Sequence, residues 1–157
     1  MPRTTPRPVR RRLWSLATGE LVSIVVLPWV AYGLIGLPLS PANVLGTALA
    51  LFVLLQGSVY WLLKLRRPAA PRGMQVYAVL RWLNPVLLAV ALPPLVVAVV
   101  NGPADEAIAG LVFWVLAVLE HVNYFHTQLM YDNATDLRRL RTSGLQRAHL
   151  GLDIARR

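Results

Sequence analysis

The sequence predicts an all-α integral membrane protein: an up-down-up-down bundle of four transmembrane helices with cytoplasmic N- and C-termini. The first observation is composition, since 56% of the 157 residues are apolar, 15% are charged and the mean hydropathy is +0.52. An ordinary water-soluble domain is less apolar than this. The second observation is that the apolar residues gather in four runs, each near or above the ~20 residues that cross a hydrocarbon layer of ~30 Å. The third is that the basic residues lie almost entirely outside those runs.

Turn-forming segments rich in proline, glycine and asparagine separate the four runs. These connections are too short to hold further domains, so successive helices should be antiparallel neighbours. We therefore expect a basic tail at 1–12, a transmembrane domain at 13–131 with spans at 13–37, 42–65, 76–100 and 107–131, and a second basic tail at 132–157.

The basic residues predict the orientation of the bundle. A net charge of +9 with a pI near 11.3 would suggest nucleic-acid binding in a soluble protein. Here, every basic residue except Arg81 lies in the N-terminal tail, the middle loop or the C-terminal tail. The other two connections have no basic residue, and the second carries Asp105 and Glu106. Because short loops rich in Lys and Arg stay inside, we expect an inner (plasma) membrane protein with both termini in the cytoplasm.

Arginine clusters beside the span ends predict contact with the bilayer surface. Each such residue gains ~1 kcal/mol from anionic lipid headgroups. The tails lack the interleaved aromatic residues of a single-strand reader, so nucleic acid is not an expected partner. In 132–157, helix-capping and apolar residues favour short helices that lie on the membrane surface. The basic residues assigned to that surface are Arg10, Arg11, Arg12, Arg66, Arg67, Arg138, Arg139 and Arg141.

Each predicted helix also carries polar residues at helical spacing, and their depths coincide. Counted from the cytoplasmic ends of the spans, the charged and amide groups lie roughly 7–17 Å inside the boundary. An unpaired charge at that depth costs ~3 kcal/mol or more. We therefore expect Arg81 to be held between Glu20 and Glu120. The whole predicted site comprises Glu20, Gln56, Arg81, Asn84, Glu120, His121, Asn123, Tyr124 and His126.

Two interpretations of this polar cluster stay open. Ion pairs within a membrane can act as packing contacts that fix the register of the helices. Alternatively, two carboxylates facing one guanidinium leave one negative charge, which a proton, a charged histidine or a cationic ligand could neutralise. In that case the cluster would be a ligand or proton site open to the cytoplasm.

The sequence argues against a metal or haem centre. His121 and His126 are five residues apart, about 140° around a helix, so they cannot both face one ion. The residue three positions after Glu120 is Asn123, so the Glu-x-x-His pattern of di-iron bundles is absent from the sequence. The chain also has no cysteine to supply a thiolate. We therefore expect no cofactor and assign no catalytic residue.

These observations favour a non-enzymatic accessory or binding protein whose polar cluster lies in the cytoplasmic half of the bundle. One alternative is a small transporter or proton-coupled carrier, which would work as an oligomer because four helices enclose little space. A second alternative is a membrane enzyme acting on a lipid or a quinone, with the segment from Glu120 to His126 as its acid or base. A homo-oligomer or a larger membrane complex fits each of these functions.

Overall fold

The computed structural model describes residues 7–67, 71, 73–129, 138, 141–142 and 144–156. Most of these residues are helical, and the β-type contact among them is an isolated antiparallel bridge between Thr127 and Arg147. Four helical stretches are long and apolar enough to cross a membrane, which agrees with the four long apolar helices that the sequence predicts. The elements in chain order are α1 (Arg7–Pro28), η1 (Trp29–Leu34), α2 (Pro41–Arg66), α3 (Met74–Asn101), η2 (Ala104–Glu106), α4 (Ile108–Phe125) and α6 (His149–Ala155).

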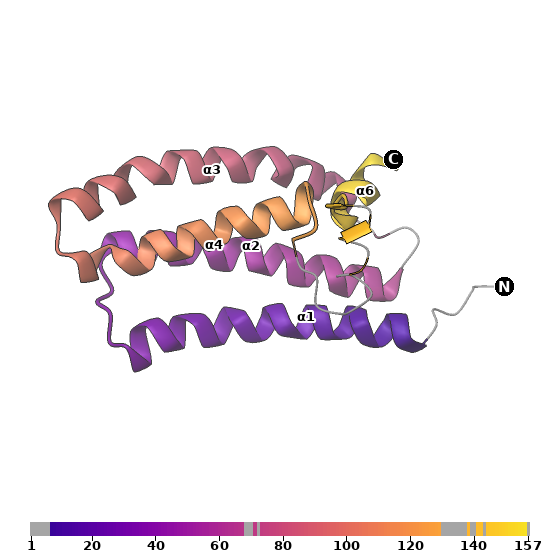
Figure 1. The fold of residues 1–157 in the computed structure, drawn as a ribbon, viewed down its shortest axis with the longest axis horizontal. Coiled ribbons are helices and arrows are strands. Elements are labelled where there is room, and N and C mark those ends of the chain that lie inside the picture. The colour runs from indigo at the N-terminus through magenta and orange to yellow at the C-terminus, as the bar shows by residue number, and fades with distance from the viewer. Residues whose placement is uncertain are drawn as a thin grey trace.

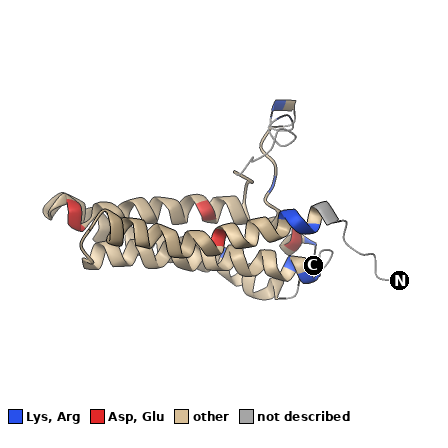
Figure 2. Ribbon diagram, turned by 90° about the horizontal axis from the view of Figure 1, so that it is seen from below, with Lys and Arg blue, Asp and Glu red and all other residues tan. Residues whose placement is uncertain are grey.

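The four long helices lie side by side and run antiparallel in sequence order, as the short connections predict (Figure 1). α1 packs mainly against α2, which also packs against α4, while α3 lies on the other side of the bundle against α4 and α2. Both termini lie at one end. We call this the basic end, because α1 and α2 place Arg10, Arg11, Arg12, Lys64, Arg66 and Arg67 there, and we call the opposite end, with Asp105 and Glu106, the acidic end (Figure 2).

Two helix boundaries differ from the predicted ones. α1 begins at Arg7, inside the predicted tail, because arginine is a good helix former and Pro8 is tolerated in a first turn. α4 ends at Phe125, well before the predicted end of the fourth span at residue 131. Beyond it the chain pairs with the C-terminal segment: the Ala148 N–H donates to the His126 carbonyl at 3.1 Å. That pairing replaces the hydrogen bonds that a longer helix would make.

Close backbone contact joins α2 and α4 near the acidic end of the bundle. A Cβ atom on Gly46 would collide with the backbone of Gly110, and one on Gly110 would collide with the backbone of Ala42. Asn43 is fully buried in this seam, and its Oδ1 accepts a hydrogen bond from the Gly110 N–H at 2.8 Å. The small residues therefore let the two helices touch, and one amide pairs a free N–H in the first turn of α4.

Candidate functional site

The structure divides the predicted polar site into two groups of interacting side chains. The first, the cavity cluster, joins α1, α2 and α4 and consists of Glu20, Trp61, Glu120, Asn123 and Tyr124. The second, the amide cluster, joins α2, α3 and α4 and consists of Gln56, Tyr77, Asn84 and His121. The sequence predicted a single site, because helical spacing fixes the depth of these residues but not their position around the bundle.

A cavity of about 400 Å³ lies beside the first group, toward the basic end. Its wall comes from α1, α2, the end of α4 and α6, which returns to the bundle from the C-terminal segment. The wall is mostly apolar and has polar groups at a few positions. The lining residues that matter below are Leu13, Leu16, Glu20, Trp61, Lys64, Asn123, Tyr124, His149 and Leu150.

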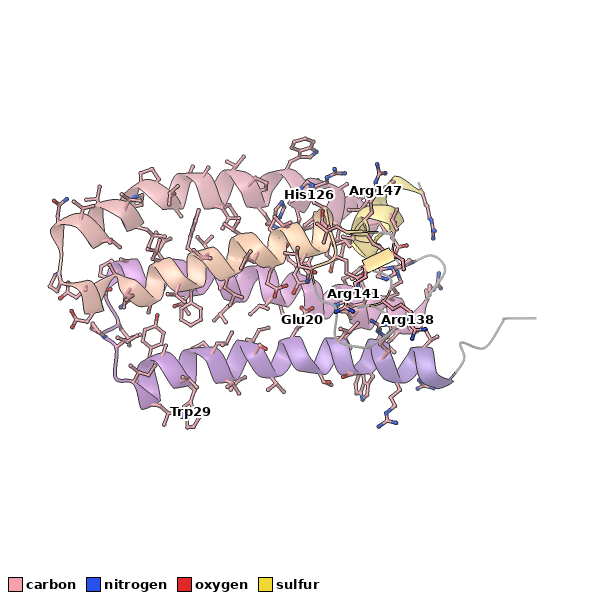
Figure 3. All side chains as sticks on the ribbon, in the orientation of Figure 1. Glu20, Trp29, His126, Arg138, Arg141 and Arg147 are labelled. Atoms are coloured by element: carbon pink, nitrogen blue, oxygen red, sulfur yellow. The ribbon has the colours of Figure 1, made fainter. Side chains whose placement is uncertain are left out.

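Glu20 is held in place by residues of two other helices. It lies on the face of α1 that is turned toward α2 and α4, whereas Trp29, the first residue of η1, points away from the bundle (Figure 3). The Trp61 Nε1–H donates to Glu20 Oε1 at 3.0 Å. Glu20 Oε2 is buried against Gly57 of α2 and lies beside Tyr124 of α4. The carboxylate is therefore held between α2 and α4.

Tyr124 places its hydroxyl next to that oxygen. Its side chain is 4% exposed, and its hydroxyl interacts with the carboxylates of Glu20 and Glu120. Gly57 makes room for the contact, because a Cβ at this position would collide with both Glu20 Oε2 and the Tyr124 hydroxyl. A carboxylate and a hydroxyl from different helices thus meet above one glycine of α2.

Glu120 adds a second carboxylate one helical turn from Tyr124. Its Oε2 accepts a hydrogen bond from Asn123 Nδ2 at 3.2 Å, and Asn123 Oδ1 in turn accepts from the Leu129 N–H at 2.8 Å. Glu120 lies near enough to Glu20 for the two charges to interact. Among the residues that the structure describes, the ion pairs involve Asp153, and neither glutamate has a cationic partner.

The expected bridge from Arg81 to Glu20 and Glu120 is therefore wrong for the described part of the chain. Arg81 is on α3, and α2 and α4 lie between α3 and α1, which carries Glu20 (Figure 1). Its side chain is partly exposed, and it interacts electrostatically with His121 rather than with a glutamate. Arg81 and the two glutamates have similar depths along their helices, but similar depth does not bring side chains on different helices into contact.

The amide cluster is a nearly closed hydrogen-bond network. Gln56 and Asn84 bond to each other in both directions, at 3.1 and 2.8 Å, and the Tyr77 hydroxyl donates to the Gln56 carbonyl at 2.8 Å. Asn84 Nδ2 lies 3.5 Å from His121 Nδ1, while His121 Nε2 is buried and has no partner among the described residues. Gln56, Asn84 and His121 therefore join α2, α3 and α4 mainly as packing contacts.

His121 of α4 and His126, the residue after the helix, lie next to each other. The His121 and His126 rings lie edge to face with their centres 5.4 Å apart, and His126 is exposed at the end of the helix (Figure 3). Among the described side chains, no group of three or more His, Asp or Glu is placed to hold an ion.

The rim of the cavity contains residues that the sequence did not single out. The side chain of Asp153 in α6 is 7% exposed and accepts hydrogen bonds from Tyr60 at 2.7 Å and Lys64 at 2.6 Å, both on α2. This contact docks α6 on the bundle, with Leu150 only 2% exposed. Only weak features of the sequence point to this contact: Lys64 is the one lysine of the chain, and Asp153 is an isolated acidic residue in a basic segment.

No family model, curated protein or solved structure matches this chain. The residues assigned to the membrane surface include exposed Arg10, Arg11, Arg66, Arg67, Arg138 and Arg141. Arg12 is exposed and also lines the cavity, while Arg139 lies outside the described residues. Contact of these side chains with lipid headgroups stays a prediction.

Proposed function

We propose that this chain is a multi-pass membrane protein that binds an amphiphilic small molecule in the cavity at its basic end. The observation that carries this proposal is a largely apolar cavity of about 400 Å³ whose wall holds a few polar side chains, among them Glu20, Lys64 and Asn123. A ligand with an apolar body and one polar group fits a wall of this kind.

The contrast with the rest of the bundle supports binding rather than structural packing. The buried amides of the bundle are hydrogen-bonded within the protein: Asn43 has three hydrogen bonds from its side chain, and Gln56 and Asn84 pair reciprocally, although His121 Nε2 beside them has no described partner. Glu20, Lys64 and Asn123 instead line open volume. Pockets for small molecules commonly combine apolar walls with a few polar groups of this kind.

We further propose that the basic end faces the cytoplasm of the inner membrane. Short segments rich in Lys and Arg are retained on that side. In this orientation the cavity is reached from the cytoplasmic leaflet, and α6, which forms part of its wall, lies at the cytoplasmic surface. The binding role also fits the expectation of a non-enzymatic protein, since a largely apolar cavity can hold a ligand without chemistry.

The test compares two matched substitutions that differ only in location. Leu16→Trp puts an indole into the cavity, whereas Leu83→Trp makes the same change on the exposed face of α3. The probe is 4-phenylbutan-1-ol, titrated calorimetrically into phosphatidylcholine nanodiscs that hold each variant. We expect saturable binding to the wild type and to Leu83→Trp, and binding at least about tenfold weaker to Leu16→Trp. Absence of saturable binding to the wild type, or equal binding to Leu16→Trp, would overturn the proposal.

A further inference from the structure

We infer that the cavity selects an anionic amphiphile, with the carboxylate of the ligand at Arg12 and Lys64 and its apolar body deeper in the bundle, along α1. This inference rests on the proposed binding function and specifies its ligand class. The juxtaposition that carries it is the order of side chains along the wall. Two cationic side chains line the cavity toward the basic end, and apolar side chains line it further in.

The part of the wall that α1 supplies is a single face of that helix. Its residues recur at intervals of one helical turn, and they are Val9, Arg12, Leu13, Leu16 and Glu20. At 1.5 Å per residue, Glu20 lies about 12 Å deeper along the helix axis than Arg12. The two charged residues of this face therefore lie at different depths, with the positive one nearer the basic end.

The side chains from α2 follow the same order. Lys64 lies near the end of the helix, and Trp61 lies about one turn further into the bundle. Asp153 pairs with Lys64 at 2.6 Å, and the same carboxylate has the Arg156 guanidinium 4.0 Å away. Three cations therefore surround one described acid at the outer end of the cavity, if Arg12 is included. Charge complementarity at this end favours a negative ligand group.

Both cations on the wall have donors for an acid group. The guanidinium of Arg12 carries five N–H donors in a planar fork that matches a carboxylate, so it can bind one beside another contact. The ammonium of Lys64 carries three donors. Tyr60 and Asp153 accept hydrogen bonds from it at 2.8 and 2.6 Å. A ligand carboxylate can therefore join the contacts already present without displacing them.

The carboxylate of Glu20 is already engaged by the protein. Its Oε1 accepts from Trp61 at 3.0 Å, and its Oε2 is buried against Gly57 beside the Tyr124 hydroxyl. A positive ligand group would have to displace these contacts to reach it. A negative group at Arg12 stays at the opposite end of this face, where repulsion from Glu20 is weakest.

The wall between the two ends fits an apolar or aromatic body. Leu13 and Leu16 line it from α1, Trp61 from α2 and Leu150 from α6. A volume of about 400 Å³ lies within the range of pockets that hold one small molecule. The cavity therefore suits a single-chain or single-ring carboxylate, with its charge at the basic end and its body inside the bundle.

Three probes with one body separate charge from apolar contact. They are 4-phenylbutanoate, which is ionised at pH 7, 4-phenylbutan-1-ol and 4-phenylbutylamine. Each is titrated into the same phosphatidylcholine nanodiscs, whose lipid carries no net charge, and heats from empty nanodiscs are subtracted. We expect the carboxylate to bind the wild type at least about threefold more tightly than the alcohol, and the amine to bind most weakly. The factor is modest because Arg12 is exposed and water screens its charge.

Two matched variants then locate the selectivity. Arg12→Gln removes a charge from the cavity wall, and Arg11→Gln removes the same charge from the next residue of α1, which is exposed and does not line the cavity. We expect the ratio of carboxylate to alcohol affinity to fall to near one in Arg12→Gln and to stay unchanged in Arg11→Gln. Retained affinity for the alcohol shows that Arg12→Gln is folded, so that a lost preference reports charge.

The possible failures are distinguishable. If the carboxylate and the alcohol bind the wild type equally and Leu16→Trp weakens both, the cavity binds amphiphiles but the selectivity for an anion is refuted. Tightest binding of the amine, or a preference for the carboxylate that persists in Arg12→Gln, also refutes it. An equal loss of preference in Arg11→Gln would show diffuse attraction to the basic end instead of a site. If none of the three probes binds the wild type saturably, the proposed function itself fails.

Discussion

Asn43 illustrates how much one buried amide does in this bundle. Its Nδ2 donates to the Pro38 and Asp105 carbonyls at 2.9 and 2.8 Å, and its Oδ1 accepts from the Gly110 N–H at 2.8 Å. The side chain therefore ties α2 to both connections at the acidic end and to α4. In the sequence this asparagine stands next to a proline-rich turn, where asparagine is common for local reasons, and nothing signalled its distant partners.

Replacing Asn43 by alanine should destabilise the protein by about 1–3 kcal/mol, because buried backbone groups lose their partners. The matched control is Asn101→Ala, which makes the same change at the exposed end of α3 and should have little effect. The free energy of unfolding can be measured for both by denaturation with sodium dodecyl sulfate in mixed micelles. A loss of stability as small for Asn43→Ala as for Asn101→Ala would contradict the proposed role.

At the level of single residues, polarity alone identified much of the candidate site. Glu20, Glu120, Asn123 and Tyr124 stand out because each interrupts an apolar helix, and they do meet near one cavity. Arg81 stood out for the same reason, yet it lies elsewhere. Helical spacing gives the depth of a side chain, but which helices are neighbours depends on packing that the sequence does not display.

Among the elements, α6 is the one whose packing partners could not be predicted from hydropathy. Because it is short and amphipathic, we expect it on the membrane surface, and that location stays a prediction. In the structure it also packs against α4 and α3 and forms part of the cavity wall. The four long helices, by contrast, were predictable because each is long enough to cross a bilayer, and that property is local in the chain.

Asp153→Asn should release α6 from the bundle. The change removes the negative charge that pairs with Lys64 at 2.6 Å and leaves a largely buried cation without its counter-ion. Amide hydrogen exchange in α6, measured by mass spectrometry, should then become about tenfold faster or more, while exchange in α2 changes little. Arg156→Gln is the control. Arg156 is exposed, and its guanidinium lies 4.0 Å from the Asp153 carboxylate, farther than the Lys64 ammonium. Unchanged protection of α6 in Asp153→Asn would show that apolar contacts alone dock it.

On the scale of the whole molecule, the two ends of the bundle differ in charge. Both termini lie at one end of the bundle, together with the basic residues of α1 and α2, and Asp105 and Glu106 lie at the other (Figures 1 and 2). The antiparallel order of the helices follows from short connections, and the structure bears it out. Which end faces the cytoplasm is a separate question, because it depends on membrane insertion rather than on packing.

The absence of cysteine from the chain makes this orientation directly testable. Ala104→Cys and Ala155→Cys place one thiol at an exposed position at the acidic and the basic end, respectively. If the basic residues hold their end in the cytoplasm, a membrane-impermeant maleimide should label Ala104→Cys in intact bacterial cells and should label Ala155→Cys only after permeabilisation. The opposite pattern would place the cavity toward the outer leaflet. The amphiphile that it binds would then have to arrive from outside the cell, although the residues that line the cavity would be the same.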